Sequence, residues 1–422
     1  MILVAWFSLT IFLVFLLSFV NKSTDLLSPA RLFILVWSFA IGITNFKFSV
    51  FQREWSEFGW LMLIITLLSF LSGLFVVYVL NADKDIKTVH QSRKIILDQV
   101  INKDLLFKIL VIFFILYLVS FMVSFAIMGF VPAFSPRPEI RTQWTGVFGF
   151  GLITHALPPI LFFSSIYFFY EKKSITKRVI VFIIAVSTFF LNLLVLHRFD
   201  IVYWLVVFLA FLYYATYKLK FKYLVLFGSF LVATIYGIST FRASKFISNL
   251  IYYISEMKYS VKYAIFTEPY MYFAMNVENF VHAVERYTNY TYGFFTFNPI
   301  LSIIQLKHPL EEYMAINKFP NLIVSNYNTY TMFFEWYRDF GIFGLAFIPF
   351  IWGIIIAACY YNLKKRPSLS AVTLYGAFLF VILFSFFVNM LGWLHFIFNL
   401  SALYFIAKAI SNQKKSETSI LK

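Results

Sequence analysis

Long apolar runs recur along almost the whole chain, and they constrain its fold more than any other feature. A run of about 18 or more apolar residues is long enough for an α-helix to cross a bilayer. Because lipid offers no hydrogen-bond partners, only helices or closed barrels cross it, and these runs are too long for barrel strands. With 61% hydrophobic and 13% charged residues, the sequence predicts an all-α, polytopic integral membrane helical bundle and excludes a soluble domain.

About 11 transmembrane helices and one large external loop are expected from the spacing of these runs. The predicted spans are 2–20, 31–49, 58–80, 105–129, 148–170, 179–196, 201–217, 223–241, 340–362, 370–389 and 391–410. This predicts a membrane bundle over 1–241 with spans one to eight. An external loop with amphipathic helices follows over 242–339, and 340–422 holds spans nine to eleven and a cytoplasmic tail.

The distribution of positive charge predicts the orientation. A formal net charge of +16 would suit nucleic acid, but most basic residues stand at the ends of apolar runs, as topology-setting charges do. They concentrate in the connections 21–30, 81–104, 171–178, 218–222 and 363–369 and in the C-terminal tail. The positive-inside rule therefore predicts an external N-terminus, a cytoplasmic C-terminus and no nucleic-acid partner. The first span is expected to be a retained helix, because no basic n-region or cleavage pattern accompanies it.

The long segment between the eighth and ninth spans has the composition of folded structure, since it is rich in aromatics and lacks a Pro/Ser/Gly bias. Thr267-Glu268-Pro269 predicts a helix start, and apolar residues from Tyr270 to Val284 follow at helical spacing. Asn276, Asn279 and His282 fall between them. This helix is therefore expected to be amphipathic and suited to lie along the bilayer surface.

Polar residues gather where this segment enters the ninth span. Asn328-Thr329-Tyr330-Thr331 is followed by Trp336-Tyr337-Arg338-Asp339-Phe340-Gly341. Arg338 and Asp339 are candidates to contact an anionic ligand and a sugar hydroxyl, respectively. An acidic residue near a helix N-terminus also interacts favourably with the helix dipole, which would account for Asp339 alone.

Arginines on the predicted outer side are candidates to bind phosphate or carboxylate oxygens, whose geometry fits the guanidinium fork. Arg198 lies between two spans that leave almost no loop, where an arginine is costly without a partner or ligand. Arg137 and Arg141 lie in a proline-stiffened loop, and Arg242 directly follows the eighth span. For Arg198 the alternatives are a local pairing with Asp200 or snorkelling to lipid headgroups. For the other arginines the alternative is contact with lipid headgroups.

Tyrosine and histidine suggest further candidates. Thirteen of the 27 tyrosines lie between 242 and 338, which suits either a glycan-binding surface or an interfacial aromatic belt. No two histidines show metal-ligand spacing, so neither a metal nor another cofactor is expected. His282, near Glu278 and Glu285, is a candidate proton acceptor, with an ordinary surface histidine as the alternative. The single cysteine, Cys359, allows no intrachain disulfide.

Taken together, these residues resemble the O-antigen polymerase family, also called oligosaccharide repeat-unit polymerases. The resemblance rests on the stretch from Asn328 to Gly344, on the loop from Pro132 to Arg141, and on Arg198 between two central spans. The layout of spans with one large late external loop extends it over essentially the whole chain. One motif differs, because no external arginine is followed by a glycine after ten intervening residues. A two-loop capture-and-release scheme is therefore not carried over.

The resemblance implies a metal-independent glycosyltransferase of the bacterial inner or plasma membrane. Its substrate would be an undecaprenyl-pyrophosphate-linked oligosaccharide, polymerised into a surface polysaccharide on the outer face, with a flippase and a chain-length regulator as candidate partners. Arg198, Arg338, Asp339 and His282 are then the candidate catalytic residues. The candidate substrate-binding residues are Arg137, Arg141, Arg242, Tyr337, Asn328 and Tyr292.

Two other functions stay open on the sequence. A ligase that moves a finished glycan from the same carrier also uses arginines in a large external loop. A flippase for lipid-linked oligosaccharides belongs to a different class, and transporters of that kind usually show repeated halves and short loops. The chain shows neither repeated halves nor uniformly short loops.

Overall fold

Helices make up most of the computed structural model, which describes residues 2–18, 25–135, 144, 147, 149–216 and 245–412. In these residues, two short strands, β1 (Val100–Ile101) and β2 (Ser411–Asn412), pair antiparallel. Ten of the predicted spans coincide with helices: α1 (Ile2–Leu17), α2 (Pro29–Thr44), α3 (Glu57–Val79), α5 (Lys103–Met128), α8 (Leu157–Tyr170), α9 (Ile175–Val195), α10 (Arg198–Ala215), α16 (Phe334–Lys365), α17 (Leu369–Phe384) and α18 (Leu394–Ile410). The predicted span 223–241 lies outside the described residues.

Five of the described helices are long and apolar enough to cross a membrane, namely α3, α5, α9, α10 and α16. Helices α1, α2, α8, α17 and α18 are apolar but shorter, with 10–17 residues each. The all-α class is therefore confirmed. The count of eleven spans and the external position of the loop stay predictions.

The chain forms two compact units, each assembled from segments distant in sequence. Unit 1 consists of Met1–Asp85, Lys220–Tyr361 and Val381–Trp393. Unit 2 consists of Ile86–Leu219, Asn362–Phe380 and Leu394–Lys422. The predicted division at 241 and 339 concerns position relative to the membrane, and it stays a prediction.

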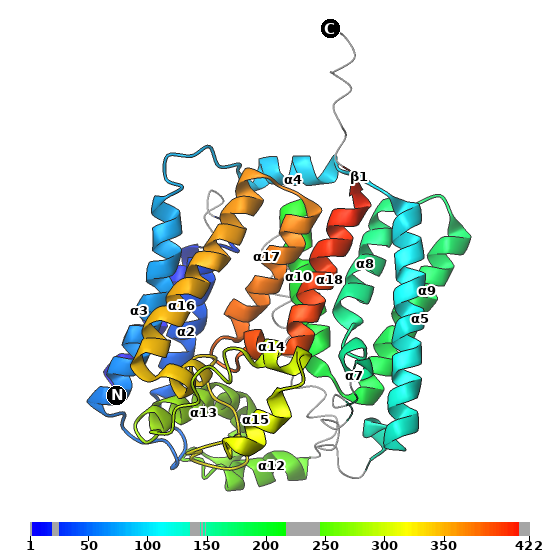
Figure 1. The fold of residues 1–422 in the computed structure, drawn as a ribbon. Helices are drawn as coiled ribbons and strands as arrows, with labels where there is room; N and C mark the ends of the chain where they lie inside the picture. Colours follow the sequence, from blue (N-terminus) through cyan, green and yellow to red (C-terminus); the bar gives the residue numbers. More distant parts are fainter. Residues whose placement is uncertain are drawn as a thin grey trace. The chain divides into compact units, whose positions relative to one another are not determined.

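In unit 2, α5, α8 and α9 pack against one another, and α10 and α18 both contact α8 (Figure 1). Tyr117, Ala156, Ile160 and Ile184 form one of its buried apolar clusters. Burial of such side chains against neighbouring helices, rather than local propensity, supplies most of the stability of helices in proteins.

The predicted span 148–170 is wrong in one respect, because two helices occupy its described part. A short helix, α7 (Phe150–Ile153), ends before α8 begins at Leu157. The cause is readable in the sequence, since Pro158 and Pro159 lack amide hydrogens and disfavour helical backbone immediately before them. The break places His155 between the two helices.

Glycines permit a close helix crossing in unit 1. A Cβ atom on Gly73 of α3 would lie 2.1 Å from the carbonyl oxygen of Phe350 on α16. A Cβ atom on Gly353 would in turn lie 2.4 Å from the carbonyl oxygen of Phe70. Small residues allow helix backbones to approach closely in this way, which is a common packing mode in membranes.

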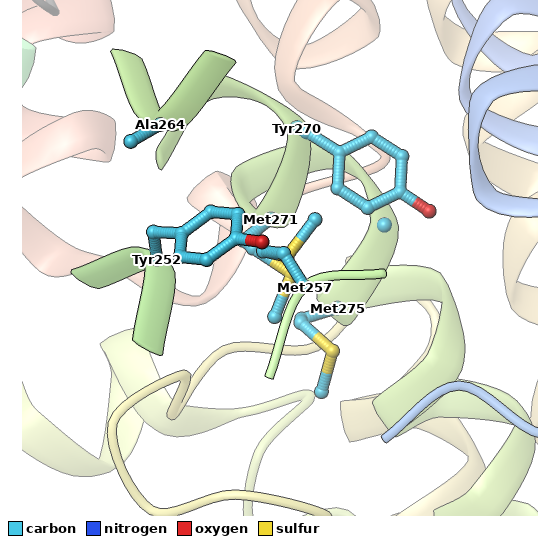
Figure 2. Close-up of a cluster of buried hydrophobic side chains, with 7 residues drawn as sticks. Tyr252, Met257, Ala264, Tyr270, Met271 and Met275 are labelled. Carbon is cyan, nitrogen blue, oxygen red and sulfur yellow. The ribbon is translucent and has the colours of Figure 1, made fainter. Parts of the chain in front are cut away.

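The segment after residue 244 folds into short helices that gather at one end of α2, α3 and α16 (Figure 1). They are α12 (Lys245–Ile254), η4 (Val261–Phe266), α13 (Thr267–Val284), α14 (Asn298–Ile303) and α15 (Lys307–Tyr313). The predicted helix start at Thr267 is confirmed. Figure 2 shows Tyr252, Met257, Met271 and Met275 packed together between α12 and α13 in a buried cluster.

Helix α13 differs from the expected amphipathic helix, because its polar residues Asn276, Glu278 and Asn279 are buried. The Asn279 Nδ2 atom donates to the carbonyl oxygens of Tyr327 (2.7 Å) and Thr329 (2.9 Å). Glu278 pairs with Lys47 and accepts a hydrogen bond from Trp55 Nε1 at 3.0 Å. These contacts hold the loop before α3 and the segment before α16 against α13. Spacing along one helix cannot reveal such partners.

Candidate functional site

The polar motif before the ninth span forms a kinked junction in unit 1. Helix α16 is interrupted at Gly341, where φ is 59° and ψ is −138°. The carbonyl oxygens of Arg338 and Asp339 therefore accept hydrogen bonds from outside the helix, from the amides of Thr291 (2.8 Å) and Tyr292 (3.2 Å). This backbone conformation is accessible almost only to glycine. The glycine is thus required by the turn itself.

Replacing Gly341 by alanine is expected to destabilise the protein. The backbone strain alone costs about 1–3 kcal/mol, and a new Cβ atom would lie 3.0 Å from the Tyr290 hydroxyl. A lower melting temperature in detergent, measured by intrinsic fluorescence, would show the effect. Gly129→Ala is the matched control, since φ is +72° there but nothing lies within 4 Å of the added Cβ atom. An equal or larger loss in the control would contradict the role of the Tyr290 contact.

Asp339 is fully buried and connects α16 to the loop after α13. Its Oδ1 atom accepts hydrogen bonds from Thr291 Oγ1 (2.5 Å) and the Phe295 amide (3.1 Å). Its Oδ2 atom accepts from the amide and the hydroxyl of Thr296, both at 2.6 Å. Both carboxylate oxygens are therefore engaged by the protein itself. Hydrogen bonds to a charged acceptor are among the stronger ones in proteins.

Arg338 is also buried, and its guanidinium contacts aromatic rings and backbone oxygens. The guanidinium carbon lies 3.9 Å from the ring centre of Phe295 and 5.5 Å from that of Tyr287. The two Nη atoms donate to the carbonyl oxygens of Asn317 (2.5 Å) and Lys318 (3.3 Å). Such cation–π contacts strengthen when the cation is shielded from water. Arg338 thus fastens the segment after α15 to the start of α16.

The three remaining candidates of this segment differ in exposure. Tyr337 is buried, and its hydroxyl donates to the carbonyl oxygen of Val284 at 2.8 Å. Asn328 is exposed, and Tyr292 is 80% exposed. Asn328 and Tyr292 are therefore accessible to a ligand from solvent, whereas Tyr337 supports the packing of α16 against α13.

His282 lies near the end of α13, half-buried beside an exposed arginine. Arg286 Nη1 donates a hydrogen bond to His282 Nε2 at 2.8 Å, which requires the neutral imidazole. Burial and, second, the charge of Arg286 lower the pKa of His282 below its ordinary value. Arg286 was not singled out from the sequence, although its spacing of four residues from His282 on a helix would have predicted the contact.

The lowered pKa of His282 predicts a dependence of stability on pH. The unfolded state takes up the proton as the pH falls through the ordinary histidine value of about 6.5, whereas the folded state resists it. Stability should therefore fall as the pH drops below that value. We expect melting temperatures between pH 7.5 and 5.5 to decline less steeply for His282→Gln than for the wild type. Identical slopes would contradict this assignment.

Unit 2 holds Arg198, the first residue of α10, in a half-buried position. Asp200, in the same helical turn, is buried, and its Oδ2 atom lies 2.8 Å from His155 Nδ1 and 3.6 Å from His197 Nδ1. The ring of His155 stacks on those of His197 and His395, with centroids 3.8 Å and 4.1 Å apart. Sequence spacing gave no sign of this cluster, because its histidines come from three distant segments.

A half-buried glutamate, Glu335, was also missed in unit 1. Glu335 lies one helical turn before Asp339, and Asn389 Nδ2 donates to its Oε2 atom at 2.7 Å. The contact ties the start of α16 to the segment after α17. The sequence placed Glu335 beside the polar motif, but nothing in it indicated Asn389 as a partner.

The candidates fall into three groups by position. Arg338, Asp339, Tyr337, His282, Asn328 and Tyr292 all belong to unit 1, and Arg198 belongs to unit 2. The first three lie together at the α16 junction. Arg137, Arg141 and Arg242 lie outside the described residues, so their roles stay predictions.

Comparison with known proteins assigns the chain to a family. The sequence model of the family described as "Putative O-antigen polymerase" matches residues 2–388. No curated protein and no solved structure matches the chain. With the apolar helices, the family match indicates a multi-pass membrane protein of polysaccharide biosynthesis, a polymerase that joins repeat units of a lipid-linked oligosaccharide. Because the match spans nearly the whole sequence, the chain belongs to the O-antigen polymerase family.

Proposed function

We propose that the protein polymerises undecaprenyl-pyrophosphate-linked oligosaccharide units on the outer face of the bacterial inner or plasma membrane. The family match over residues 2–388 carries this proposal. The excess of basic residues in one set of connections supports an external N-terminus and a cytoplasmic C-terminus. That orientation places the segment 242–339 on the outer face. A flippase would supply the lipid-linked units, and a chain-length regulator would act beside the polymerase.

The proposed reaction is a glycosyl transfer between two lipid-linked substrates. A hydroxyl of the incoming unit attacks the anomeric carbon of the growing glycan, and the bond from that carbon to the pyrophosphate oxygen breaks. Undecaprenyl pyrophosphate leaves with the bonding electrons, and a base takes the hydroxyl proton. Charge develops on the leaving pyrophosphate, so fixed positive groups beside it lower the barrier.

Arginines rather than a metal ion are proposed to stabilise the leaving group. Arg198 is the principal candidate, because it stands at the first residue of a helix, and both its guanidinium and the helix N-terminus favour an anion. Arg141 is proposed to bind the same pyrophosphate, and Arg137 and Arg242 are proposed as further contacts. These four arginines would share one role, contact with the departing pyrophosphate.

The structure suggests a positioning role for Arg338 and Asp339. Both side chains are buried and engaged by neighbouring protein groups, so we propose that they hold the loop after α13 in place. His282 is the better candidate for the base, because it is neutral and half-buried. The exposed Asn328 and Tyr292 are proposed to line the glycan groove, with Tyr337 supporting them from inside.

Deleting the gene in its host tests the proposal. Loss of the polymerase should leave single repeat units attached to their final acceptor, with the ladder of longer chains absent from a glycan gel. Loss of a ligase would instead leave full-length polymer on the lipid carrier. Loss of a flippase would leave lipid-linked single units on the cytoplasmic side. Either of these last two results would overturn the proposal.

A reconstituted assay tests the chemistry itself. The purified protein is incubated in detergent with lipid-linked repeat units extracted from the deletion strain. We expect a ladder of chain lengths and release of one undecaprenyl pyrophosphate per bond formed, at the same rate with and without added Mg²⁺. A strict requirement for Mg²⁺ would show that a metal ion, rather than arginine alone, stabilises the leaving group.

A further inference from the structure

We propose that His155, His197 and Asp200 in unit 2 form a binding site for one divalent transition-metal ion of the zinc type. The inference goes beyond the proposed function, in which arginines stabilise the leaving group. Each of the three residues offers one ligand atom, and these atoms all lie within 4.8 Å of one another. The set combines two imidazole nitrogens with one carboxylate oxygen.

The separations fit an ion between the ligands. Nitrogen and oxygen ligands lie about 2.0–2.2 Å from Zn²⁺, so two of them in a tetrahedron are roughly 3.3 Å apart. The Asp200 Oδ2 atom lies 2.8 Å from His155 Nδ1 and 3.6 Å from His197 Nδ1, on either side of that value. The two rings are stacked with planes 6° apart, so the in-plane lone pairs of their nitrogens run parallel. Binding one ion would therefore require the rings to rotate out of the stack until both lone pairs converge on it.

The cluster holds a buried carboxylate that a cation would stabilise. Asp200 is 3% exposed, and a buried carboxylate is costly unless a positive group compensates it. One divalent ion would compensate the carboxylate, and imidazoles bind a metal ion in their neutral form.

Two buried polar atoms beside the cluster use none of their hydrogen-bonding capacity. His155 is 6% exposed, and its Nε2 atom has no hydrogen-bond partner. Asn192 donates to Asp200 Oδ2 at 3.3 Å through Nδ2, while its Oδ1 atom is likewise without a partner. Unsatisfied buried groups are rare in folded proteins and point to an unseen ion or water. Their position next to three ligand atoms favours an ion with its bound water.

The donor set defines the class of metal. Imidazole with one carboxylate favours zinc and neighbouring transition metals over Mg²⁺ and Ca²⁺, which prefer sites made of oxygen alone. Three protein ligands leave a fourth position for water or an anionic oxygen. The ion would link the break between α7 and α8 to the first turn of α10. Arg198 lies between two of the ligand residues in sequence, so the ion would also fix its position.

Metal content and coordination geometry can be measured without an activity assay. The full-length protein, purified in detergent through a tag without histidine, is treated with EDTA, incubated with ZnCl₂ and desalted. We expect one zinc ion per chain, measured by inductively coupled plasma mass spectrometry. Loading with Co²⁺ in place of zinc should give the intense visible absorption of a tetrahedral ion, which EDTA removes. A wild-type protein that retains no zinc and shows no such absorption would overturn the proposal.

Single substitutions locate the site. His155→Gln and Asp200→Asn should each lower the retained zinc at least tenfold, whereas His308→Gln, at an exposed histidine of unit 1, should leave it unchanged. Asn192→Ala keeps all three ligands but removes the hydrogen bond to Asp200, so it should weaken zinc binding about 10–100-fold. Equal zinc in His155→Gln and the wild type would place the ion elsewhere. Because zinc content is measured without assaying polymer formation, these results test the metal site independently of the proposed function.

Discussion

Replacing Arg198 by alanine is expected to abolish polymer while the protein stays in the membrane at its normal level. If the guanidinium stabilises the departing pyrophosphate, its loss removes charge stabilisation that is present chiefly in the transition state. Loss of one such donor slows an enzyme by about 10²–10³-fold. A glycan gel would then show single repeat units in place of the ladder. An immunoblot of the membrane fraction would show that the variant is still inserted.

Two further variants make this result specific. Arg198→Lys keeps the charge but not the two-pronged hydrogen bonding, so it should retain partial activity with shorter chains. Arg366→Ala removes an exposed arginine of the same unit on the predicted cytoplasmic side, and its ladder should match the wild type. Unchanged chain length and amount in Arg198→Ala would rule out the role. Equal loss in the Arg366 variant would show a general effect of charge instead.

Asp339→Ala is expected to give the largest loss of stability among the candidate residues in unit 1. The substitution removes the acceptor for the partly buried amides of Phe295 and Thr296 and for the hydroxyls of Thr291 and Thr296. A buried donor left unsatisfied costs about 1–3 kcal/mol, and the two amides cannot turn to other acceptors as the hydroxyls can, so the free energy of unfolding should fall by about 2–6 kcal/mol. Thermal unfolding in detergent should show a lower transition, and limited proteolysis should cleave the loop between α13 and α14 sooner.

Asp339→Asn and an exposed aspartate separate the causes. The asparagine keeps one acceptor oxygen but turns an amide N–H toward the donors that Oδ2 now serves, so it should still destabilise the protein, by less than alanine. Asp83→Ala, at an exposed position of the same unit, should change stability by less than about 0.5 kcal/mol. A native melting temperature in Asp339→Ala would show that the hydrogen bonds around this carboxylate contribute little.

The polar motif before α16 was predictable as a set of residues but not as a set of contacts. Tyr337, Arg338, Asp339 and Gly341 stand out in the sequence as residues that a simple membrane span does not need. The helix dipole does not explain the position of Asp339, because its carboxylate accepts hydrogen bonds from the loop at 291–296, which lies outside helix α16. Which atoms meet depends on where that loop passes, and the spacing within the motif carries no information on it.

The fold was predictable where hydrogen bonding is local. The predicted spans in the described residues coincide with helices, apart from the break within 148–170. The start of α13 at Thr267 was also predicted, although the Thr267 hydroxyl makes no capping hydrogen bond. The helix break at His155 is also predictable from Pro158 and Pro159, but these prolines lie within an apolar run that predicts one continuous span. The burial of Asn279 could not be predicted from the sequence, because its hydrogen-bond partners lie more than 40 residues further along the chain.

The sequence by itself determined that this chain is a helical membrane protein and which family it belongs to. Apolar runs of this length must satisfy their backbone hydrogen bonds within each segment, so composition and length settle the secondary structure. Only the tertiary structure decided that His155, His197 and Asp200 share one cluster and that Asp339 holds a distant loop. Side-chain contacts between remote segments depend on how helices pack, and helix packing follows shape and burial that no local pattern encodes.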